Sequence, residues 1–408
     1  MNNIKENLKK SFQYIKNIFK WLLLSAITGI IGGLLGTAFH KCLDVVTDFR
    51  MQNSAITYFM PLGVIVIIAM YNRYRGSEKI DTNLVIEAVR EEDKKIPILM
   101  APFIFIATTI TQLFGGSAGR EGAALQIGGS VGHNLGKIFR LNKKEIQMIT
   151  MAGMGSVFSA LFSTPVTAAI FSLEVAFVGV FNLAGILPCL LASGCAFCVA
   201  MLFGISNEAA VSMPVESISL GMIVKVIALA VCCGLVSRLF CFAIQKSEKM
   251  MQKWFKNPYL RGIVGALVVV ILTLATKTFD YNGAGMHVVE KALSGDARAY
   301  DFLMKILFTA ISIAAGFKGG EIVPAFFVGA TFGCVIGPFF GLGSGLAAAI
   351  GMVAVFCGVV NCPLASIILS VEMFGANGLL LFGLACGVSY VISGRSGLYK
   401  SQRFFACD

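Results

Sequence analysis

The chain has 408 residues, of which 57% are hydrophobic and only 13% are charged. Soluble globular domains carry about 25% charged residues, so this composition excludes an ordinary soluble protein and indicates an all-α polytopic membrane protein. The formal net charge of +11 fits the excess of Lys and Arg in cytosolic membrane loops. Because the basic residues lie in short loops and near the N-terminus, they do not favour nucleic-acid binding.

Residues 1–22 form the first predicted element. They contain five lysines and have apolar residues at helical spacing, which is typical of an amphipathic helix on the cytosolic membrane face. No cleavage site follows the apolar core, so the segment does not resemble a signal peptide.

Apolar segments of uneven length follow along the chain. A plain spanning helix needs about 20 apolar residues, and several segments are shorter than this while others are too long for one crossing. Such lengths predict broken, tilted and re-entrant helices. In chain order the segments are Trp21–His40, Ile56–Met70, Ile96–Phe114, Met148–Phe181, Ala184–Phe203, Leu220–Phe242, Tyr259–Thr276, Phe302–Gly316 and Gly345–Tyr390.

Two of these segments match each other. The stretch "AGMGSVFSALFSTPVTAAIFSLEVAF" around Pro165 matches "IGMVAVFCGVVNCPLASIILSVEMFG" around Pro363, with eight identities over 22 positions at a constant spacing of 198 residues. The match predicts two membrane repeats, residues 23–205 and 218–402, joined by a linker at 206–217. Internal duplication is typical of secondary transporters.

The loops of the two repeats differ in charge. The loop at 137–145 is rich in Lys and Arg, whereas its counterpart at 337–345 has neither. Equivalent loops with opposite charge bias are expected on opposite sides of the membrane, which favours inverted repeats. The match also pairs Glu174 with Glu372, for which we expect matched structural roles in capping or polar packing.

Each repeat carries a glycine-rich segment ahead of an apolar, helix-like run: "GGSAGREGAALQIGGSVG" from Gly115 and "FKGGEIVPAFFVGATFGCVIG" from Phe317. A helix that starts inside the membrane presents unpaired N–H groups and the positive end of its dipole, and these favour an anion. Two such starts, one from each repeat, could converge on one ion. The alternative is that the glycines only allow close helix packing.

Two acidic residues favour the anion site over packing alone. Glu121 and Glu321 lie inside the two glycine-rich segments, and an ionisable residue at bilayer depth costs about 2.5–3.5 kcal/mol or more. An ionised carboxylate could occupy the anion's own position, and a protonated one could withdraw and carry a proton. Arg120 is expected to pair locally with Glu121, ahead of a role in attracting anions.

Cofactor and enzyme chemistry find little support in the sequence. Most of the twelve cysteines lie inside apolar segments, and the three histidines add no metal-ligand cluster, so no metal, cofactor or disulfide framework is predicted. The paired aspartates, Ser/His pair or His-rich motif of an intramembrane enzyme are lacking, so an enzyme is not expected. A purely structural membrane scaffold leaves Glu121 and Glu321 unexplained.

Three motifs, "GGSAGREGA", "KGGEIVPAFFVGA" and "GLYKS", together resemble those of the CLC family of chloride channels and anion/proton antiporters. The resemblance extends from about Trp21 to Tyr399, with Ala123 where proline is usual. It implies an inverted-repeat helical fold, a homodimer in the lipid bilayer and one ion pathway per subunit. It also implies a multi-pass protein of the cell membrane, here the bacterial inner membrane, without a C-terminal cytosolic regulatory domain.

The resemblance also assigns residue roles. Glu121 becomes the gating glutamate that exchanges protons, and Tyr399 offers a hydroxyl to the central anion. The other residues implied at the anion site are Gly119, Arg120, Gly122, Ile322 and Val323, together with the backbone amide of Glu321.

Departures from the family pattern indicate the subtype. Chloride-transporting relatives carry a serine in a G-S-G-I-P loop, and the corresponding stretch here, "SEKIDTNLVIEAV", puts that position at Thr82, with Asn83 as the alternative. Val175 replaces the inner proton-transfer glutamate, whereas Glu321 adds a carboxylate to the second segment. This pattern is similar to the bacterial fluoride-exporting branch, in which the second glutamate takes part in fluoride and proton movement.

The predicted function is therefore fluoride/proton antiport that exports fluoride. The fluoride branch often has a threonine where this chain has Val323, and methionine or asparagine where it has Thr82. Since the Thr82 hydroxyl could restore a chloride-type site, exchange of chloride or a broader range of monovalent anions for protons is the alternative. A passive anion channel is the third possibility.

Overall fold

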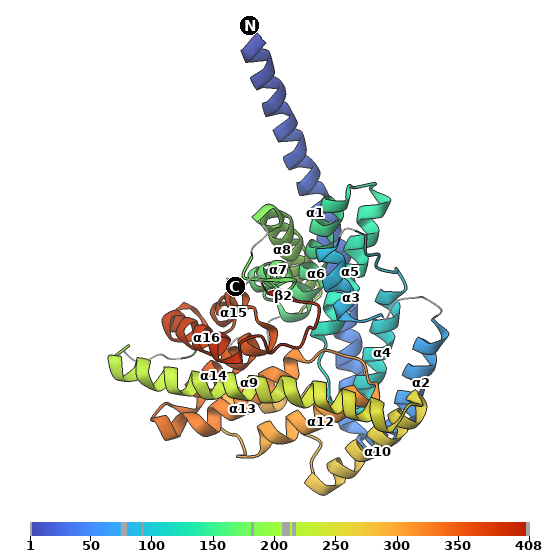
Figure 1. Ribbon diagram of the computed structural model, residues 1–408, viewed down its shortest axis with the longest axis vertical. Coiled ribbons are helices and arrows are strands. Elements are labelled where there is room, and N and C mark those ends of the chain that lie inside the picture. Colours follow the sequence, from blue (N-terminus) through green and yellow to red (C-terminus); the bar gives the residue numbers. More distant parts are fainter. Residues whose placement is uncertain are drawn as a thin grey trace.

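The computed structural model describes residues 2–74, 80–91, 93–180, 183–205, 213 and 218–404. These residues form sixteen α-helices, four short 3-10 helices and one pair of two-residue strands (Figure 1). The first eight helices are α1 Asn2–Gln52, α2 Met60–Arg73, α3 Thr82–Arg90, α4 Met100–Phe114, α5 Glu121–Ile138, α6 Lys143–Phe162, α7 Pro165–Glu174 and α8 Ile186–Leu202. The second eight are α9 Leu220–Trp254, α10 Pro258–Thr276, α11 Met286–Leu293, α12 Asp301–Ala315, α13 Ile322–Ile336, α14 Ser344–Val360, α15 Pro363–Phe374 and α16 Leu379–Ser393. The 3-10 helices are η1 Ser54–Phe59, η2 Leu183–Gly185, η3 Gly337–Phe340 and η4 Ala376–Gly378, and the parallel strands are β1 Phe177–Val178 and β2 Arg403–Phe404.

The helices repeat in the same order of long and short elements, so α1–α8 correspond to α9–α16. In the described parts of the chain, eight helical segments are long and apolar enough to cross a membrane, and α4, α7, α14 and α15 are shorter apolar helices. The predicted mixture of spanning and broken helices is therefore confirmed. The protein is a multi-pass membrane protein.

Proline divides the apolar segments that are too long for one crossing. The chain turns at Ser163 (φ 54°) and Asn361 (φ 56°), which are left-handed residues at the ends of α6 and α14. Pro165 and Pro363 then start α7 and α15. Proline suits the first helical turn because it has no N–H to leave unpaired, and the residue before it is disfavoured in a helix.

The two halves are inverted relative to each other, as predicted. Glu174 at the end of α7 accepts the backbone N–H of Ala365 at the start of α15, at 2.8 Å. Glu372 at the end of α15 accepts the N–H of Thr167 at the start of α7, also at 2.8 Å. Each helix end therefore contacts the other helix's beginning, so the equivalent helices run antiparallel. The expected capping roles of both glutamates are confirmed.

The helices that begin at the glycine-rich segments lie at the centre of the molecule. Every residue of α13 from Ile322 to Cys334 is buried, and α5 is buried along most of its length. Each packs closely on the helix that follows it, because glycines meet at the contact: Gly128 of α5 on Gly153 of α6, and Gly329 of α13 on Gly351 of α14. The packing role considered for these glycines is thus correct for those inside the helices.

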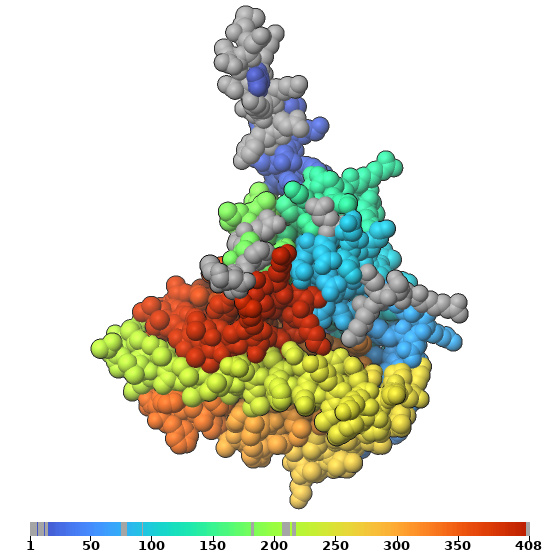
Figure 2. All heavy atoms as spheres, in the orientation of Figure 1, coloured from blue at the N-terminus to red at the C-terminus, as the bar shows by residue number. Residues whose placement is uncertain are grey.

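The boundaries of the predicted domains are only partly visible. The boundary at residue 22 lies within α1, which continues unbroken from Asn2 to Gln52 and projects from the rest of the chain at its N-terminal end (Figures 1 and 2). Lys20 forms an ion pair with Glu145 at the start of α6. The predicted linker at 206–217 falls outside the described residues except for Met213. The membrane-surface position of residues 1–22 stays a prediction.

Candidate functional site

The two glycine-rich segments meet backbone to backbone. The N–H of Gly119 donates to the carbonyl of Gly320 at 2.6 Å, and the N–H of Gly320 donates to the carbonyl of Gly119 at 2.9 Å. Arg120 and Glu321 follow as the N-caps of α5 and α13, with nearly the same backbone angles. The bridge therefore brings together the N-terminal ends of two central helices, one from each half.

Matched hydrogen bonds show which residues correspond in the two halves. The N–H of Ser117 donates to Oγ of Ser312 at 3.0 Å, and the N–H of Lys318 donates to Oγ1 of Thr111 at 3.1 Å. Thr111 and Ser312 occupy equivalent positions near the ends of α4 and α12. By this correspondence Glu321 is the counterpart of Arg120, so the two glutamates of the site are not equivalent by symmetry.

Glu121 is the first residue of α5, and its side chain is fully buried. Neither carboxylate oxygen has a hydrogen-bond partner among the described residues. The backbone N–H groups of Arg120, Glu121 and Val323 lie close enough to interact with the carboxylate electrostatically, although none meets hydrogen-bond geometry. The carboxylate thus faces the N-terminal ends of both α5 and α13, which is where an anion is favoured.

Glycine makes room for this carboxylate. A Cβ atom on Gly119 would overlap both oxygens of Glu121, and a Cβ atom on Gly320 would lie 2.5 Å from Oε2 of Glu121 and 2.5 Å from the backbone nitrogen of Gly122. The folded-back position of the Glu121 side chain therefore requires glycine at both positions.

Thr82 lies beside the same glycines. It is the first residue of α3, buried, and its Oγ1 accepts a hydrogen bond from Nε2 of Gln126 at 3.0 Å. A Cβ atom on Gly122 would lie 3.4 Å from this Oγ1 and 3.2 Å from Cα of Gly320. The predicted residues Thr82 and Gly122 are therefore neighbours of the backbone bridge.

Asn83, the alternative to Thr82, has a different contact. Its Oδ1 accepts the backbone N–H of Ser401 at 3.2 Å, and Oγ of Ser401 donates to Glu87 at 2.7 Å. Arg90 also donates to the carbonyl of Ser401. These hydrogen bonds join the C-terminal segment to α3. The Asn83 side-chain oxygen therefore has a hydrogen-bond partner without a bound ion.

The hydrogen bonds between Ser401 and α3 also help to hold Tyr399 in the interior. The Tyr399 side chain is buried, and its hydroxyl has no hydrogen-bond partner in the described part of the chain. Tyr399 lies close enough to Glu321 and Glu121 to interact with both charges. A buried hydroxyl without a partner is uncommon, so it has free capacity to donate to a ligand.

Glu321 and the residues after it complete the predicted set. The Glu321 side chain is half-buried and interacts electrostatically with Glu121 and Lys318. Ile322 and Val323 are buried in the first turn of α13, where backbone N–H groups have no partner within the helix. The structure therefore gathers Glu121, Thr82, Tyr399 and the starts of α5 and α13 in one region.

Arg120 departs from the prediction. Its guanidinium does not pair with Glu121; its Nη1 bonds to Nδ1 of His40 at 2.9 Å and lies 3.8 Å from Oδ1 of Asp44, both on α1. The guanidinium also lies over the ring of Phe162, 5.4 Å from the centroid. The expected local pair is wrong because the guanidinium is bound by His40 and Asp44 of α1 instead.

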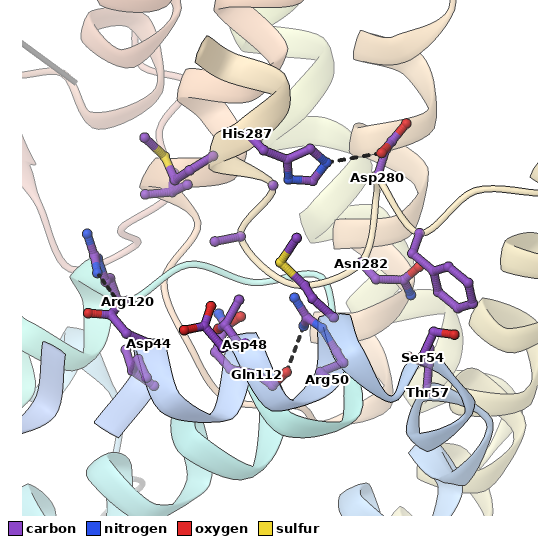
Figure 3. Close-up of a pocket in the computed structure, with 18 residues that line it drawn as sticks. Asp44, Asp48, Arg50, Ser54, Thr57, Gln112, Arg120, Asp280, Asn282 and His287 are labelled. Atoms are coloured by element: carbon purple, nitrogen blue, oxygen red, sulfur yellow. Dashed lines mark hydrogen bonds and ion pairs between the residues drawn. The ribbon is translucent and has the colours of Figure 1, made fainter. Parts of the chain in front are cut away.

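Two cavities approach the gathered residues. The first, which we call the α1 cavity, has a volume of about 570 Å³ and includes Arg120 and Val323 in its wall (Figure 3). The second, which we call the C-terminal cavity, has a volume of about 380 Å³ and includes Tyr399 and three basic side chains, Arg238, Arg395 and Lys400. Glu121 lines neither cavity. Its neighbours Arg120 and Val323 line the first, and Tyr399, which lies close enough to interact with its charge, lines the second.

At the rim of the α1 cavity, a carboxylate is bonded to two basic side chains. Asp280 accepts from Nε2 of His287 at 3.0 Å and from Nη2 of Arg298 at 3.1 Å, as Figure 3 shows for the histidine. The hydrogen bond from His287, with the charge of Arg298, lowers the pKa of Asp280 well below its usual range. This carboxylate is therefore ionised at neutral pH.

Sequence reasoning missed Gln126, His40 and Gln402. Gln126 bonds to Thr82, and Nε2 of Gln402 donates to the carbonyls of Val175, at 3.0 Å, and Val360, at 2.8 Å. For His40 and Gln126 the available signal was a polar residue within an apolar stretch, whereas Gln402 lies in the polar C-terminal stretch and gave no such signal. No group of three or more His, Cys, Asp or Glu that could hold a metal occurs in the described residues.

Comparison with known proteins identifies the family of the chain. A family model described as "Voltage gated chloride channel" matches residues 62–394. A chloride/fluoride channel protein of Pseudomonas syringae pv. tomato is 32% identical over 95% of this chain and 87% of its own length. The H(+)/Cl(-) exchange transporter ClcA of Vibrio cholerae serotype O1 is 24% identical over 90% of this chain and 84% of its own length. Among solved structures, a CLC-type fluoride/proton antiporter superposes with a TM-score of 0.90 at 32% identity, covering 95% of this chain and 98% of that one.

Proposed function

Because the chain belongs to the voltage-gated chloride channel family, known as CLC, we propose that it is a proton-coupled anion antiporter that exports fluoride. The observation that carries the proposal is the buried carboxylate of Glu121, which has no hydrogen-bond partner among the described residues and faces the N-terminal ends of two helices. Its neighbours line two separate cavities. The similarity to a fluoride/proton antiporter over nearly the whole chain supports the choice of fluoride.

The anion binds where the carboxylate now lies. Backbone N–H groups at the starts of α5 and α13 and the hydroxyls of Thr82 and Tyr399 replace the water that fluoride loses. These donors carry partial charges, so they stabilise the ion without holding it as strongly as a full counter-charge would. An ionised Glu121 competes for the same space and blocks the path from one cavity to the other.

Protonation of Glu121 couples the two ions. A neutral carboxyl is attracted less to the helix N-termini, so it leaves the position and admits the anion. Glu321 supplies a second carboxylate on the other helix start, close enough to Glu121 to interact with it. Val175 occupies the place of the usual inner glutamate, and its carbonyl is bonded to Gln402. We therefore propose that Glu321 carries the proton to or from Glu121.

The orientation follows from charge. Lys20, the 137–145 loop and the basic wall of the C-terminal cavity carry much of the positive charge that membrane proteins keep on the cytosolic side. Fluoride accordingly enters from the C-terminal cavity and leaves through the α1 cavity. The protein lies in the cell membrane, and we propose that two subunits form a homodimer in the bilayer with one pathway each.

Proton exchange for chloride or a broader range of monovalent anions is the second candidate. The observation that favours it is the presence of two buried hydroxyls, those of Thr82 and Tyr399. The family resemblance aligns Thr82 with the serine of chloride-transporting relatives. Efflux of the two anions from the same liposomes separates the candidates, and a passive channel is separated by the absence of proton uptake.

Glu121→Gln tests the proton-coupling role. Glutamine keeps the size of the side chain but cannot exchange a proton, so fluoride-driven proton uptake into liposomes should fall to the level of protein-free liposomes. Glu290→Gln on the exposed surface of α11 is the matched control and should exchange as the wild type does. Proton uptake at the wild-type rate in the Glu121 variant would reject the proposed mechanism.

Glu321→Gln tests the second carboxylate. Proton transfer by a positioned side chain typically contributes a factor of about 10²–10⁴, so coupled exchange should fall by about a hundredfold. The measurement is simultaneous fluoride efflux and proton uptake, with thermal stability recorded to exclude unfolding. Wild-type turnover in this variant would reassign Glu321 to a structural role.

A further inference from the structure

Arg120 is joined to Glu121 in the chain, yet its side chain is bound elsewhere. Its guanidinium bonds to His40 at 2.9 Å and lies 3.8 Å from Asp44 on the wall of the α1 cavity, where Figure 3 shows Arg120 and Asp44 side by side. The Glu121 carboxylate, by contrast, has no hydrogen-bond partner among the described residues. A cation and a buried carboxylate on adjacent residues are therefore kept apart.

Hydrogen-bond chemistry fixes the state of His40. A guanidinium only donates, so Nδ1 of His40 must accept and carries no proton. The other ring nitrogen, Nε2, lies 3.2 Å from Oδ2 of Asp44 and donates to it. His40 is thus a neutral, buried imidazole that links Asp44 to Arg120. The charged groups that face it are Asp44 and Lys41 on α1 and Arg120 on α5.

We propose that His40 and Asp44 are positioning residues that hold Arg120 away from Glu121, so that the carboxylate stays free to exchange its proton and its place with the anion. Opposite charges in a region of low dielectric attract strongly, so an untethered guanidinium would turn onto the adjacent carboxylate. Such a pair would keep Glu121 ionised and fixed. This inference rests on the proposed function.

Replacement of His40 tests this tether, by which we mean the contacts of His40 and Asp44 with Arg120. His40→Leu removes the acceptor, so fluoride efflux should fall by about tenfold, as for loss of one hydrogen bond to a charged group. The pH optimum of efflux should also move to lower pH, because a neighbouring cation favours the ionised carboxylate. His40→Asn places an amide oxygen near the position of Nδ1, and it should restore both the rate and the pH profile.

Removal of Arg120 distinguishes release of the guanidinium from a general effect of the His40 substitution on packing. In the Arg120→Gln background, His40→Leu should have no further effect, since no guanidinium is left to release. Asp44→Asn should resemble a weaker His40→Leu, whereas Asp93→Asn, which breaks a surface pair with Lys143, should behave as the wild type. The proposal is overturned if His40→Leu keeps the wild-type rate and pH profile, if His40→Asn fails to rescue it, or if His40→Leu slows efflux equally with and without Arg120.

The wild-type traces in the same series test the proposed function separately. If the wild type carries a different anion, the ratios of efflux rates between variants are measured with that anion. They still test whether His40 and Asp44 hold Arg120 away from Glu121. If the wild type moves neither anion nor protons, the proposed function fails and the tether proposal fails with it.

Discussion

Glu121 stands among glycines because any larger neighbour would fill the position of its carboxylate. Gly119 and Gly320 come from different halves of the chain, and both lie against the carboxylate oxygens. Without side chains at these positions, the backbone N–H groups face the carboxylate, and in the proposed mechanism they face the anion that replaces it.

Gly320→Ala should block exchange at this position. The added Cβ would lie 2.5 Å from both Oε2 of Glu121 and the nitrogen of Gly122. Overpacking costs about 1–3 kcal/mol, so fluoride efflux should fall by about tenfold or more. Gly343→Ala is the matched control, because a Cβ there meets no atom within 4 Å and its φ of −62° suits alanine. Equal efflux from the two variants would contradict the close approach of Gly320 to the Glu121 carboxylate.

At the scale of elements, the halves are joined by helix ends. Glu174 and Glu372 each satisfy N–H groups at the start of the opposite short helix, and the Gly119–Gly320 bridge joins the starts of α5 and α13. A carboxylate at a helix N-terminus satisfies N–H groups that have no partner within the helix and complements its dipole. The proposed ion site is therefore supported by interactions that neither half can make alone.

Removal of either cap should destabilise the fold without changing the chemistry of the site. Glu174→Gln and Glu372→Gln each weaken two hydrogen bonds, and each should lower the free energy of unfolding by about 1–2 kcal/mol. Thermal unfolding of the purified variants measures the effect, with Glu290→Gln as the surface control. An unchanged melting temperature in both variants would show that the caps do not stabilise the fold.

At the scale of the whole molecule, the sequence predicts the repeat, its inversion and the two glycine-rich helix starts. These features are readable because apolar length, proline position and loop charge act locally. The contact between Arg120 and His40 was not predicted, since the two residues lie 80 positions apart and no periodicity relates α1 to α5. The equivalence of Glu321 with Arg120 likewise rests on matched hydrogen bonds from backbone N–H groups to side-chain hydroxyls, which the sequence does not reveal.

Two cavities reach residues next to one buried carboxylate, that of Glu121, and the proposed mechanism depends on this arrangement. A carboxylate that must move to open the path, and that changes its proton when it moves, links every anion transferred to a proton transferred in the opposite direction. A passive channel would need no carboxylate that exchanges a proton in the anion path.

The most direct test is efflux from liposomes that contain the wild-type protein and are loaded with either fluoride or chloride, with proton uptake recorded at the same time. We expect fluoride to leave faster than chloride, with proton uptake rising in proportion to fluoride efflux. Fluoride efflux without proton uptake, or chloride efflux as fast as that of fluoride, would contradict fluoride/proton antiport.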